Sequence, residues 1–260
     1  MKSTHEMTQQ APLCSSVSDS GKRVGVLAYG LFAYAVGCFG LFWLILGAGA
    51  FAPVGLSHWK ADSILLSIAV NVVLVALFAL QHTIMARAKF KQWLTAYVPA
   101  AAERSTFILM SGLVTCVVLY FWQSVPGVVW QVKNQVAYCT LYTVYLLGIL
   151  YLLLATFVTN HFELMGLRQV YLYFRKLPYT PVAFTNRFMY RYSRHPMMLG
   201  FLLLLWSVPE MSGSRFFLAL LFTVYTFIGM RFEERDLRQQ FGGTYRKYKA
   251  KVACFIPYIY

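Results

Sequence analysis

Residues 24–51 read VGVLAYGLFAYAVGCFGLFWLILGAGAF, an apolar run without a single charged side chain. At a rise of about 1.5 Å per residue, a helix of this length crosses the roughly 30 Å hydrocarbon layer of a bilayer with room for tilt. Lys22 and Arg23 precede the run, and Pro53 and Gly55 end it. The stretch therefore predicts a transmembrane helix and places the chain among membrane proteins.

Further apolar runs predict spans at about 62–84, 105–122 and 136–159. Met197 to Val208 is shorter than the roughly 20 residues that a crossing needs. A turn at 209–214 and a return helix at 215–231 complete a hairpin, either shallow or lengthened at its inner end by residues 188–192. The predicted fold class is an all-α, polytopic integral membrane protein with about five transmembrane helices, four full spans plus this C-terminal hairpin.

Composition supports the same class, because 59% of the residues are hydrophobic and only 12% are charged. The net charge of +14 is spread over the loops between apolar runs, which is typical of membrane topology and argues against nucleic acid as a partner. With a cytoplasmic N-terminus, all but Lys60, Lys133 and Arg215 of the 23 Lys and Arg residues lie inside. We therefore expect both termini in the cytoplasm and the lipid bilayer as the chain's surroundings.

The chain has no internal repeat and no second soluble domain. Residues 1–21 are polar and lack the hydrophobic core of a cleavable signal, so we expect a mobile tail followed by a single membrane domain, 22–260. The five cysteines show no metal-ligand spacing, which gives no reason to expect a metal site or a disulfide framework.

Two groups of candidate residues lie near the ends of the second and fourth spans. His161 and Glu163 follow the fourth span and could serve as a base and the group that orients it. The alternative is a polar cluster at a helix end in which Glu163 pairs with Arg168. His82 closes the second span on one helical stripe with Asn71, Val75 and Phe78, where an interhelical hydrogen bond is an alternative to catalysis.

A third candidate group lies in the C-terminal third. Arg194-His195-Pro196 stands between a basic, aromatic segment and an apolar one, and proline favours the first turn of a helix. These residues could bind polar ligands or could simply be a charged edge of the membrane. Glu233 and Glu234 could grip a ribose diol, or Glu234 could pair with Arg238 four residues later.

The spacing of motifs across the C-terminal third favours ligand binding over a merely charged membrane edge. Arg194-His195-Pro196 is followed by Gly200, then Glu233-Glu234-x-x-Leu237, Phe241-Gly242-x-x-Tyr245-x-x-Tyr248 and Phe255-Ile256-Pro257. This order resembles the C-terminal core of the isoprenylcysteine carboxyl methyltransferase superfamily. Met198 stands where that superfamily usually has tyrosine, which argues against a prenylated substrate.

Other stretches narrow the resemblance to the nurim-like branch. Residues 81–87 (QHTIMAR) and 103–105 (ERS) are similar to it, and residues 160–170 (NHFELMGLRQV) resemble the bacterial methanethiol S-methyltransferases of that branch. The resemblance covers the chain from the first span to Pro257. It implies a bacterial inner-membrane enzyme whose site opens at the cytoplasmic face.

The resemblance implies S-adenosylmethionine as cofactor, bound by residues 160–260. Carried over by position, the residues expected to bind it are Arg194, His195, Pro196, Gly200, Glu233, Glu234, Tyr245 and Tyr248. The implied reaction is the methylation of methanethiol to dimethyl sulfide by in-line displacement, with no obligate protein partner. For the base, we favour His161 oriented by Glu163, then His82, then His195.

Three other functions remain open from the sequence. One is methyl transfer to a lipid amine, a longer thiol or a carboxylate. A second is a non-enzymatic membrane protein like nurim, which the Glu233-Glu234 and tyrosine pattern disfavours because a scaffold does not need it. The third is a membrane reductase, for which the chain shows no Gly-rich dinucleotide motif.

Overall fold

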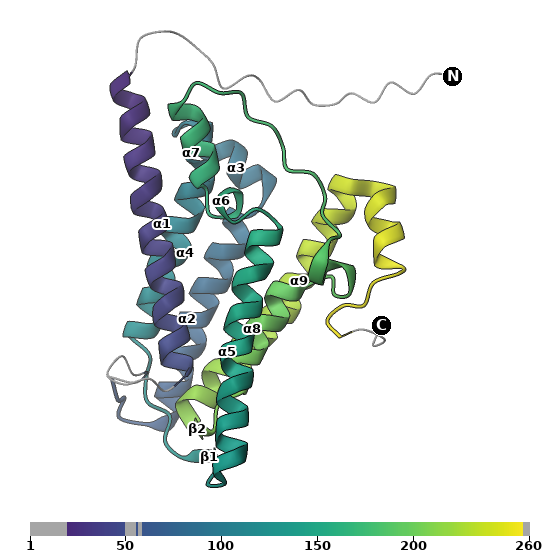
Figure 1. Ribbon diagram of the computed structural model, residues 1–260. Helices are drawn as coiled ribbons and strands as arrows, with labels where there is room; N and C mark the ends of the chain where they lie inside the picture. The colour runs from purple at the N-terminus through teal and green to yellow at the C-terminus, as the bar shows by residue number, and fades with distance from the viewer. Residues whose placement is uncertain (1–19, 50–55, 57–58, 257–260) are drawn as a thin grey trace.

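The computed structural model describes residues 20–49, 56 and 59–256, and these form a helical bundle (Figure 1). Residues 1–19 of the predicted tail lie outside the described residues, and Ser20 and Gly21 belong to the first helix. Five helices of the described part are long and apolar enough to cross a membrane. The all-α, polytopic prediction is confirmed.

The elements follow the predicted spans closely. They are α1 (Ser20–Ala48), α2 (Ile64–Met85), α3 (Ala88–Leu94), η1 (Ala100–Ala102), α4 (Glu103–Tyr120), β1 (Val128–Gln131), α5 (Gln135–Val158), α6 (His161–Leu164), α7 (Leu167–Phe174), η2 (Phe188–Arg191), α8 (Pro196–Trp206), β2 (Glu210–Ser212) and α9 (Gly213–Lys249).

Glycines set the closest helix contacts, as is common between membrane helices. α1 packs on α4, where a Cβ on Gly40 would lie 2.8 Å from the carbonyl oxygen of Gly112. α5 packs on α8, where a Cβ on Gly200 would lie 2.7 Å from the backbone nitrogen of Leu152. Only glycine permits these two approaches without moving a backbone.

The largest buried cluster fills the end of the bundle that carries β1 and β2, and it includes Trp122, Tyr145 and Met211. Along the shafts the helices present apolar side chains outward, such as Val73 and Leu80 of α2, which are 67% and 61% exposed. Such exposure is costly in water and natural in lipid, so the outer surface fits an integral membrane protein.

The C-terminal hairpin is short on one side only. α8 has 11 residues and is therefore about 16 Å long, roughly half of the hydrocarbon layer. Pro196 is its first residue, as predicted. The expected turn at 209–214 contains β2, which pairs antiparallel with β1.

The return helix is much longer than predicted. We expected it to end at Arg231, but α9 continues to Lys249. The sequence from 232 onward is polar yet rich in good helix formers, so loss of hydrophobicity does not end the helix. Gly242, with φ 50° and ψ −119°, kinks it, and the yellow part of α9 folds back in Figure 1.

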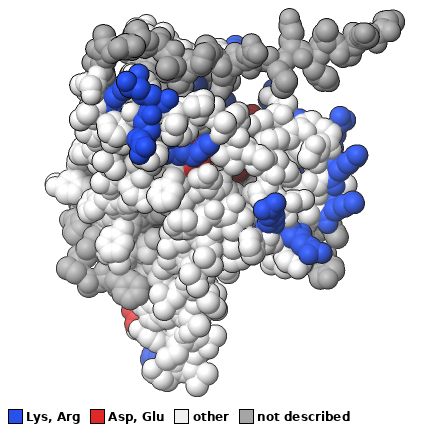
Figure 2. Space-filling view, turned by 45° about the horizontal axis from the view of Figure 1, so that its top comes forward, with Lys and Arg blue, Asp and Glu red and all other residues white. Residues whose placement is uncertain are grey.

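Charge is concentrated at the end of the bundle opposite β1 and β2. Figure 2 shows blue side chains around α7 and the kinked part of α9, with little charge along the helical shafts. The three basic residues predicted to lie outside the cytoplasm, Lys60, Lys133 and Arg215, are found at the β1–β2 end. Trp59, next to Lys60, forms a β-bridge with Gln123, and Lys133 follows β1. The Arg215 side chain donates to the Glu210 carbonyl at 2.9 Å.

Candidate functional site

Glu234 is the centre of a buried group of charges, which we call the Glu234 cluster (Arg194, His195, Glu233, Glu234 and Lys249). Its carboxylate accepts from Arg194 Nε at 2.8 Å and from His195 Nε2 at 3.4 Å, and Lys249 forms an ion pair with its other oxygen. The Glu234 side chain is only 10% exposed. Arg194, His195 and Lys249 therefore share one buried carboxylate. The alternative considered from the sequence, a pair between Glu234 and the Arg238 side chain, is not formed, since Arg238 Nε donates to the Glu234 carbonyl at 3.2 Å.

The chain end holds this cluster together. The backbone nitrogens of Arg194 and His195 donate to the carbonyls of Ala253 and Cys254 at 2.9 and 3.2 Å. The Arg194 guanidinium also donates to the Val252 carbonyl at 2.5 Å. The kink at Gly242 makes this return possible, so Lys249, which sequence analysis missed, reaches a carboxylate fifteen positions earlier.

His195 lies between two carboxylates. Its Nδ1 is 3.5 Å from Glu233 and its Nε2 is 3.4 Å from Glu234, and the residue is 3% exposed. Burial alone disfavours a charged imidazole, but hydrogen bonds to both carboxylates and their charges outweigh it and raise the pKa of His195 above its ordinary value. Both nitrogens act as donors in the imidazolium, so His195 is poorly suited to accept a further proton.

Two polar groups, one within the cluster and one near it, keep hydrogen-bonding capacity for a ligand. The Glu233 side chain is 42% exposed, and His195 is its only ion-pair partner among the described residues. The hydroxyl of Tyr245 is buried without a hydrogen-bond partner in that same part of the chain, although Tyr245 is only 1% exposed. A carboxylate that can accept a diol and an unpaired buried hydroxyl fit the sugar of a nucleoside ligand.

The other residues expected at the cofactor take different positions. The Tyr248 hydroxyl donates to the Tyr190 carbonyl at 2.6 Å, so its ring is fixed beside Tyr245, 5.9 Å between centroids. Pro196 is buried at the start of α8. Gly200 faces the backbone of α5, where its contact is one of helix packing rather than with the Glu234 cluster.

A second buried group lies between α1 and the end of α5, the His161 cluster (Tyr34, Thr156 and His161). The Thr156 hydroxyl donates to the Leu153 carbonyl at 2.6 Å and lies 2.9 Å from His161 Nδ1. Because that hydroxyl has one proton, Nδ1 must carry the imidazole proton and donate to it. His161 Nε2 then accepts from the Tyr34 hydroxyl at 3.1 Å, and burial lowers the pKa of His161.

Glu163 does not orient His161. Its carboxylate accepts from Arg168 at 2.8 Å and from the Tyr179 hydroxyl at 2.5 Å, which is the alternative pairing considered from the sequence. Burial and this hydrogen bond raise the pKa of Tyr179 to about 12. His161 and Glu163 are two positions apart, so on a helix their side chains point in different directions. Thr156 and Tyr34 hold the His161 ring instead.

Local backbone geometry explains the polar residues around His161. Asn160 has φ 84°, and its side chain accepts from the Glu163 backbone nitrogen at 3.1 Å to start α6. Gly166 also has φ 84°, and a Cβ there would lie 2.7 Å from the Ser105 nitrogen. These two turns fold the 160–170 segment back against α4.

His82 makes the interhelical hydrogen bond that the sequence offered as an alternative to catalysis. Its Nδ1 lies 3.2 Å from the Ser111 hydroxyl of α4, and its ring packs on Phe78 and Phe107. The predicted stripe faces the bundle, with Asn71 fully buried and bonded to the Gln123 backbone. His82 thus joins helices, apart from both clusters described above.

Tyr190 of η2 connects the two clusters. It is buried beside Thr159, two residues before His161, and its carbonyl accepts the Tyr248 hydroxyl. Burial and, after it, the negative charge of Glu233 raise the pKa of Tyr190. The η2 turn therefore lies between the end of α5 and the Glu234 cluster.

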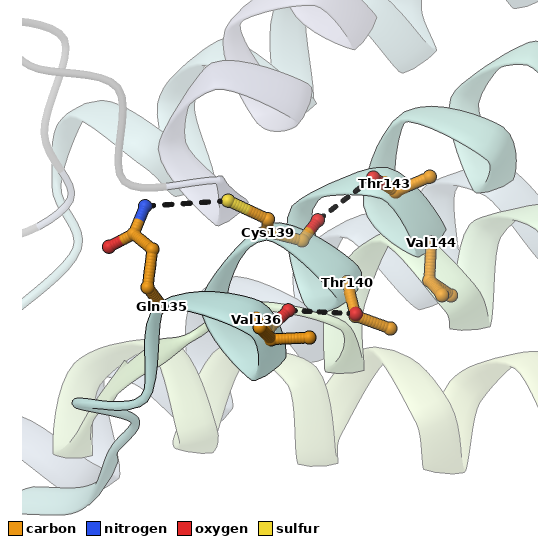
Figure 3. A pocket seen from close by; sticks show the side chains of 6 residues that line it. All are labelled: Gln135, Val136, Cys139, Thr140, Thr143 and Val144. Carbon is orange, nitrogen blue, oxygen red and sulfur yellow. Dashed lines mark hydrogen bonds between the residues drawn. The ribbon is translucent and has the colours of Figure 1, made fainter.

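A surface hollow of about 430 Å³ at the first turns of α5 has a different character (Figure 3). Its hydroxyls are satisfied within the helix, since Thr140 and Thr143 donate to the carbonyls of Val136 and Cys139 at 2.8 Å. The lining includes no charged side chain. This groove faces outward from an apolar helix and has nothing that would recognise a charged cofactor.

Comparison with known proteins shows the family of the chain. Residues 143–244, which contain both clusters except Tyr34 and Lys249, match the family model described as phospholipid methyltransferase. Methanethiol S-methyltransferase of Mycobacterium tuberculosis is 37% identical over 91% of this chain and 98% of its own length. The protein of that name from Crocosphaera subtropica is 36% identical over 97% of this chain and 98% of its own length. The chain belongs to the methanethiol S-methyltransferase family.

Nurim is a more distant relative of this chain. The rat protein is 31% identical over 68% of this chain and 70% of its own length. No solved structure matches the chain. The family resemblance inferred from sequence is thus confirmed, while the roles of individual residues rest on the geometry described above.

Proposed function

We propose that this chain is a membrane methyltransferase that transfers a methyl group from S-adenosylmethionine to methanethiol and forms dimethyl sulfide. The family match over nearly the whole chain carries this proposal. The arrangement of Glu233, Glu234 and Tyr245 supports it, because a purely structural membrane protein has no need of an exposed carboxylate beside an unpaired buried hydroxyl.

The residues of this chain suit the cofactor's polar groups. Glu233 would accept hydrogen bonds from the ribose hydroxyls, and the Tyr245 hydroxyl would fill its missing hydrogen bond. Arg194, His195 and Lys249 would keep Glu234 ionised and fixed. When bound, S-adenosylmethionine supplies the methyl group to be transferred to sulfur.

The His161 cluster would manage the proton of the thiol. The thiolate is the nucleophilic form, so removal of a proton from methanethiol favours the transfer. In our proposal Tyr34 passes its hydroxyl proton to His161 Nε2 and takes the thiol proton, which leaves a thiolate, an intact tyrosine and an imidazolium. His161 is neutral at physiological pH because burial lowers its pKa, and it can therefore accept that proton.

The charge distribution supports a proposal for the location of the site. The end with most Lys and Arg residues carries both clusters, and positive residues favour the cytoplasmic side. We place the site at the cytoplasmic face of a bacterial inner membrane, where a soluble cofactor enters from the cytosol and a small thiol from the bilayer.

Purified protein in lipid nanodiscs tests the proposal. Dimethyl sulfide measured in the headspace should require both S-adenosylmethionine and methanethiol. Calorimetry should detect binding of S-adenosylhomocysteine and no binding of NADPH, which distinguishes a methyltransferase from a reductase. Binding without methanethiol turnover would redirect the search to other thiols, amines or carboxylates, and the absence of any S-adenosylhomocysteine binding would refute the enzyme proposal.

A further inference from the structure

The kinked end of α9 and residues 184–191 line a second, open cavity, whose lining includes none of the five residues of the Glu234 cluster. Its volume is about 470 Å³. The lining residues come from 184–191 and from 244–252, and they are Phe184, Asn186, Arg191, Thr244, Lys247, Tyr248, Lys251 and Val252. Of the residues assigned above to the cofactor, Tyr248 alone lines it.

Three cations face this cavity without compensation. Arg191, Lys247 and Lys251 are exposed, and none forms an ion pair with any residue that the structure describes. No carboxylate lines the cavity. Neighbouring Lys249, in contrast, is paired with Glu234. Like charges gathered in a concave site repel one another, and a bound anion relieves that repulsion.

The cavity also has hydrogen-bond donors and an apolar wall. The Thr244 hydroxyl and the Asn186 amide add neutral donors to the rim. Phe184 and Tyr248 meet edge to face, with ring centroids 5.1 Å apart, and Val252 is buried beside them. An anion with several acceptor oxygens attached to an apolar group satisfies both parts of the lining.

S-adenosylmethionine is a poor occupant for this cavity. It carries a sulfonium and an ammonium against one carboxylate, so three uncompensated cations would repel it. The cavity lies instead in the region where the basic side chains gather, at one end of the apolar helices (Figures 1 and 2). Basic pockets in that position are typical of recognition of acidic lipid head groups.

We propose that this cavity binds a phosphate group, in the membrane that of an acidic phospholipid. The phosphate lies among Arg191, Lys247 and Lys251, and the apolar wall contacts the adjoining glycerol and acyl carbons. Binding holds the kinked part of α9 against the membrane surface. Residues 252–254, which fix Arg194 and His195, follow directly after it.

Thermal unfolding of the full chain in nanodiscs tests this proposal. In phosphatidylcholine containing about a third phosphatidylglycerol, Tm should rise by roughly 5 °C relative to phosphatidylcholine alone. The triple variant R191Q/K247Q/K251Q should lose this rise. A control with the same change of charge at exposed positions elsewhere, K89Q/K176Q/R231Q, should retain it.

Separate arms identify the source of the phosphate. Inorganic phosphate at 10 mM in phosphatidylcholine nanodiscs should give less than half of the lipid shift, whereas an equal shift would assign the site to free phosphate. A shift that survives in the triple variant, or no shift with either probe, would overturn the proposal. So would competition between phosphatidylglycerol and S-adenosylhomocysteine in calorimetry, because that would make the cavity part of the cofactor site.

Discussion

His195 and His161 are both buried, yet their surroundings give them opposite properties. Carboxylates face both ring nitrogens of His195, at 3.5 and 3.4 Å, and they raise its pKa despite burial. Hydroxyls face both ring nitrogens of His161, at 2.9 and 3.1 Å, and burial lowers its pKa. A hydroxyl can donate or accept, so it does not offset the desolvation of a cation as a carboxylate does.

The two environments differ in whether they suit ligand binding or proton transfer. The Glu234 cluster has its protons committed to ion pairs and can hold a ligand without exchanging them. The His161 cluster is neutral and connected to a single tyrosine hydroxyl, so it can accept a proton. Our proposal therefore divides binding and proton transfer between two clusters joined by η2.

Removal of the Glu234 charge should have the largest effect. Glu234→Gln leaves Arg194, His195 and Lys249 without their shared carboxylate, and breaking a buried ion pair costs about 3–5 kcal/mol. We expect a fall in Tm of roughly 6–20 °C and loss of S-adenosylhomocysteine binding, measured by scanning calorimetry and titration.

The control for Glu234→Gln lies on the same helix. Asp236→Asn breaks the pair between Asp236 and Arg87, whose side chains are 48% and 35% exposed. A surface pair contributes about 0–1 kcal/mol, so Tm should change by no more than about 4 °C. Equal losses in the two variants would show that the Glu234 cluster is no more important than a surface pair.

His161→Gln should have the next largest effect, which falls mainly on the rate. Wild-type kcat/KM should be nearly flat between about pH 7 and pH 8, because His161 is already neutral there. Without the base, the rate at pH 7 should fall by about 10²–10⁴-fold. It should then rise about tenfold per pH unit as long as the pH stays below the pKa of the thiol, because only the thiolate reacts.

Two tyrosines of α1 sharpen this test. Tyr34→Phe removes the hydroxyl on His161 Nε2 and should reproduce the pH dependence of His161→Gln. Tyr29 lies five positions before Tyr34, and its hydroxyl donates to the Thr106 hydroxyl at 2.8 Å. Tyr29→Phe should therefore leave the pH profile flat. A flat profile in His161→Gln would remove His161 from the proton transfer.

Glu233→Gln should weaken the cofactor with little effect on the fold. A hydrogen bond to a charged group contributes about 1.5–3 kcal/mol, which corresponds to a roughly 10- to 100-fold higher Kd. Titration of S-adenosylhomocysteine measures it, with Glu210→Gln at the opposite end of the bundle as control. An unchanged Kd would assign the ribose to another group.

Sequence was sufficient for the spans because uninterrupted hydrophobicity is a local property. The motif order, which identifies the family, also selected Arg194, His195, Glu233 and Glu234, and the structure brings these four residues together. The long α9 was not predictable from hydropathy, because residues 232–249 are polar and helical at once. Gly242 gave the one local signal of the kink, as a glycine inside a helix-forming stretch.

Long-range partners explain the remaining differences. Lys249 reaches Glu234 only because the kinked helix returns, and no spacing rule encodes that contact. Thr156 lies five residues before His161, but Tyr34 comes from a helix 127 positions earlier. Gly200 fits the family motif, yet its neighbours are the backbone atoms of α5, which periodicity alone cannot reveal.

The smallest expected effect is a difference in how stability depends on pH. The folded state raises the pKa of His195, so that stabilisation is complete below the unfolded value of about 6.5 and is lost as pH rises through the folded value. Glu233 is partly exposed, so the Tm advantage of wild type over Glu233→Gln should be about 2–4 °C at pH 6 and should shrink toward pH 9.

His161 has a lowered pKa, so its contribution to stability is present above about pH 6.5 and is lost as pH falls. The Tm advantage of wild type over His161→Gln should therefore shrink in the opposite direction, toward acid. Parallel slopes in the two variants would contradict the assignment of opposite charge states to the two histidines.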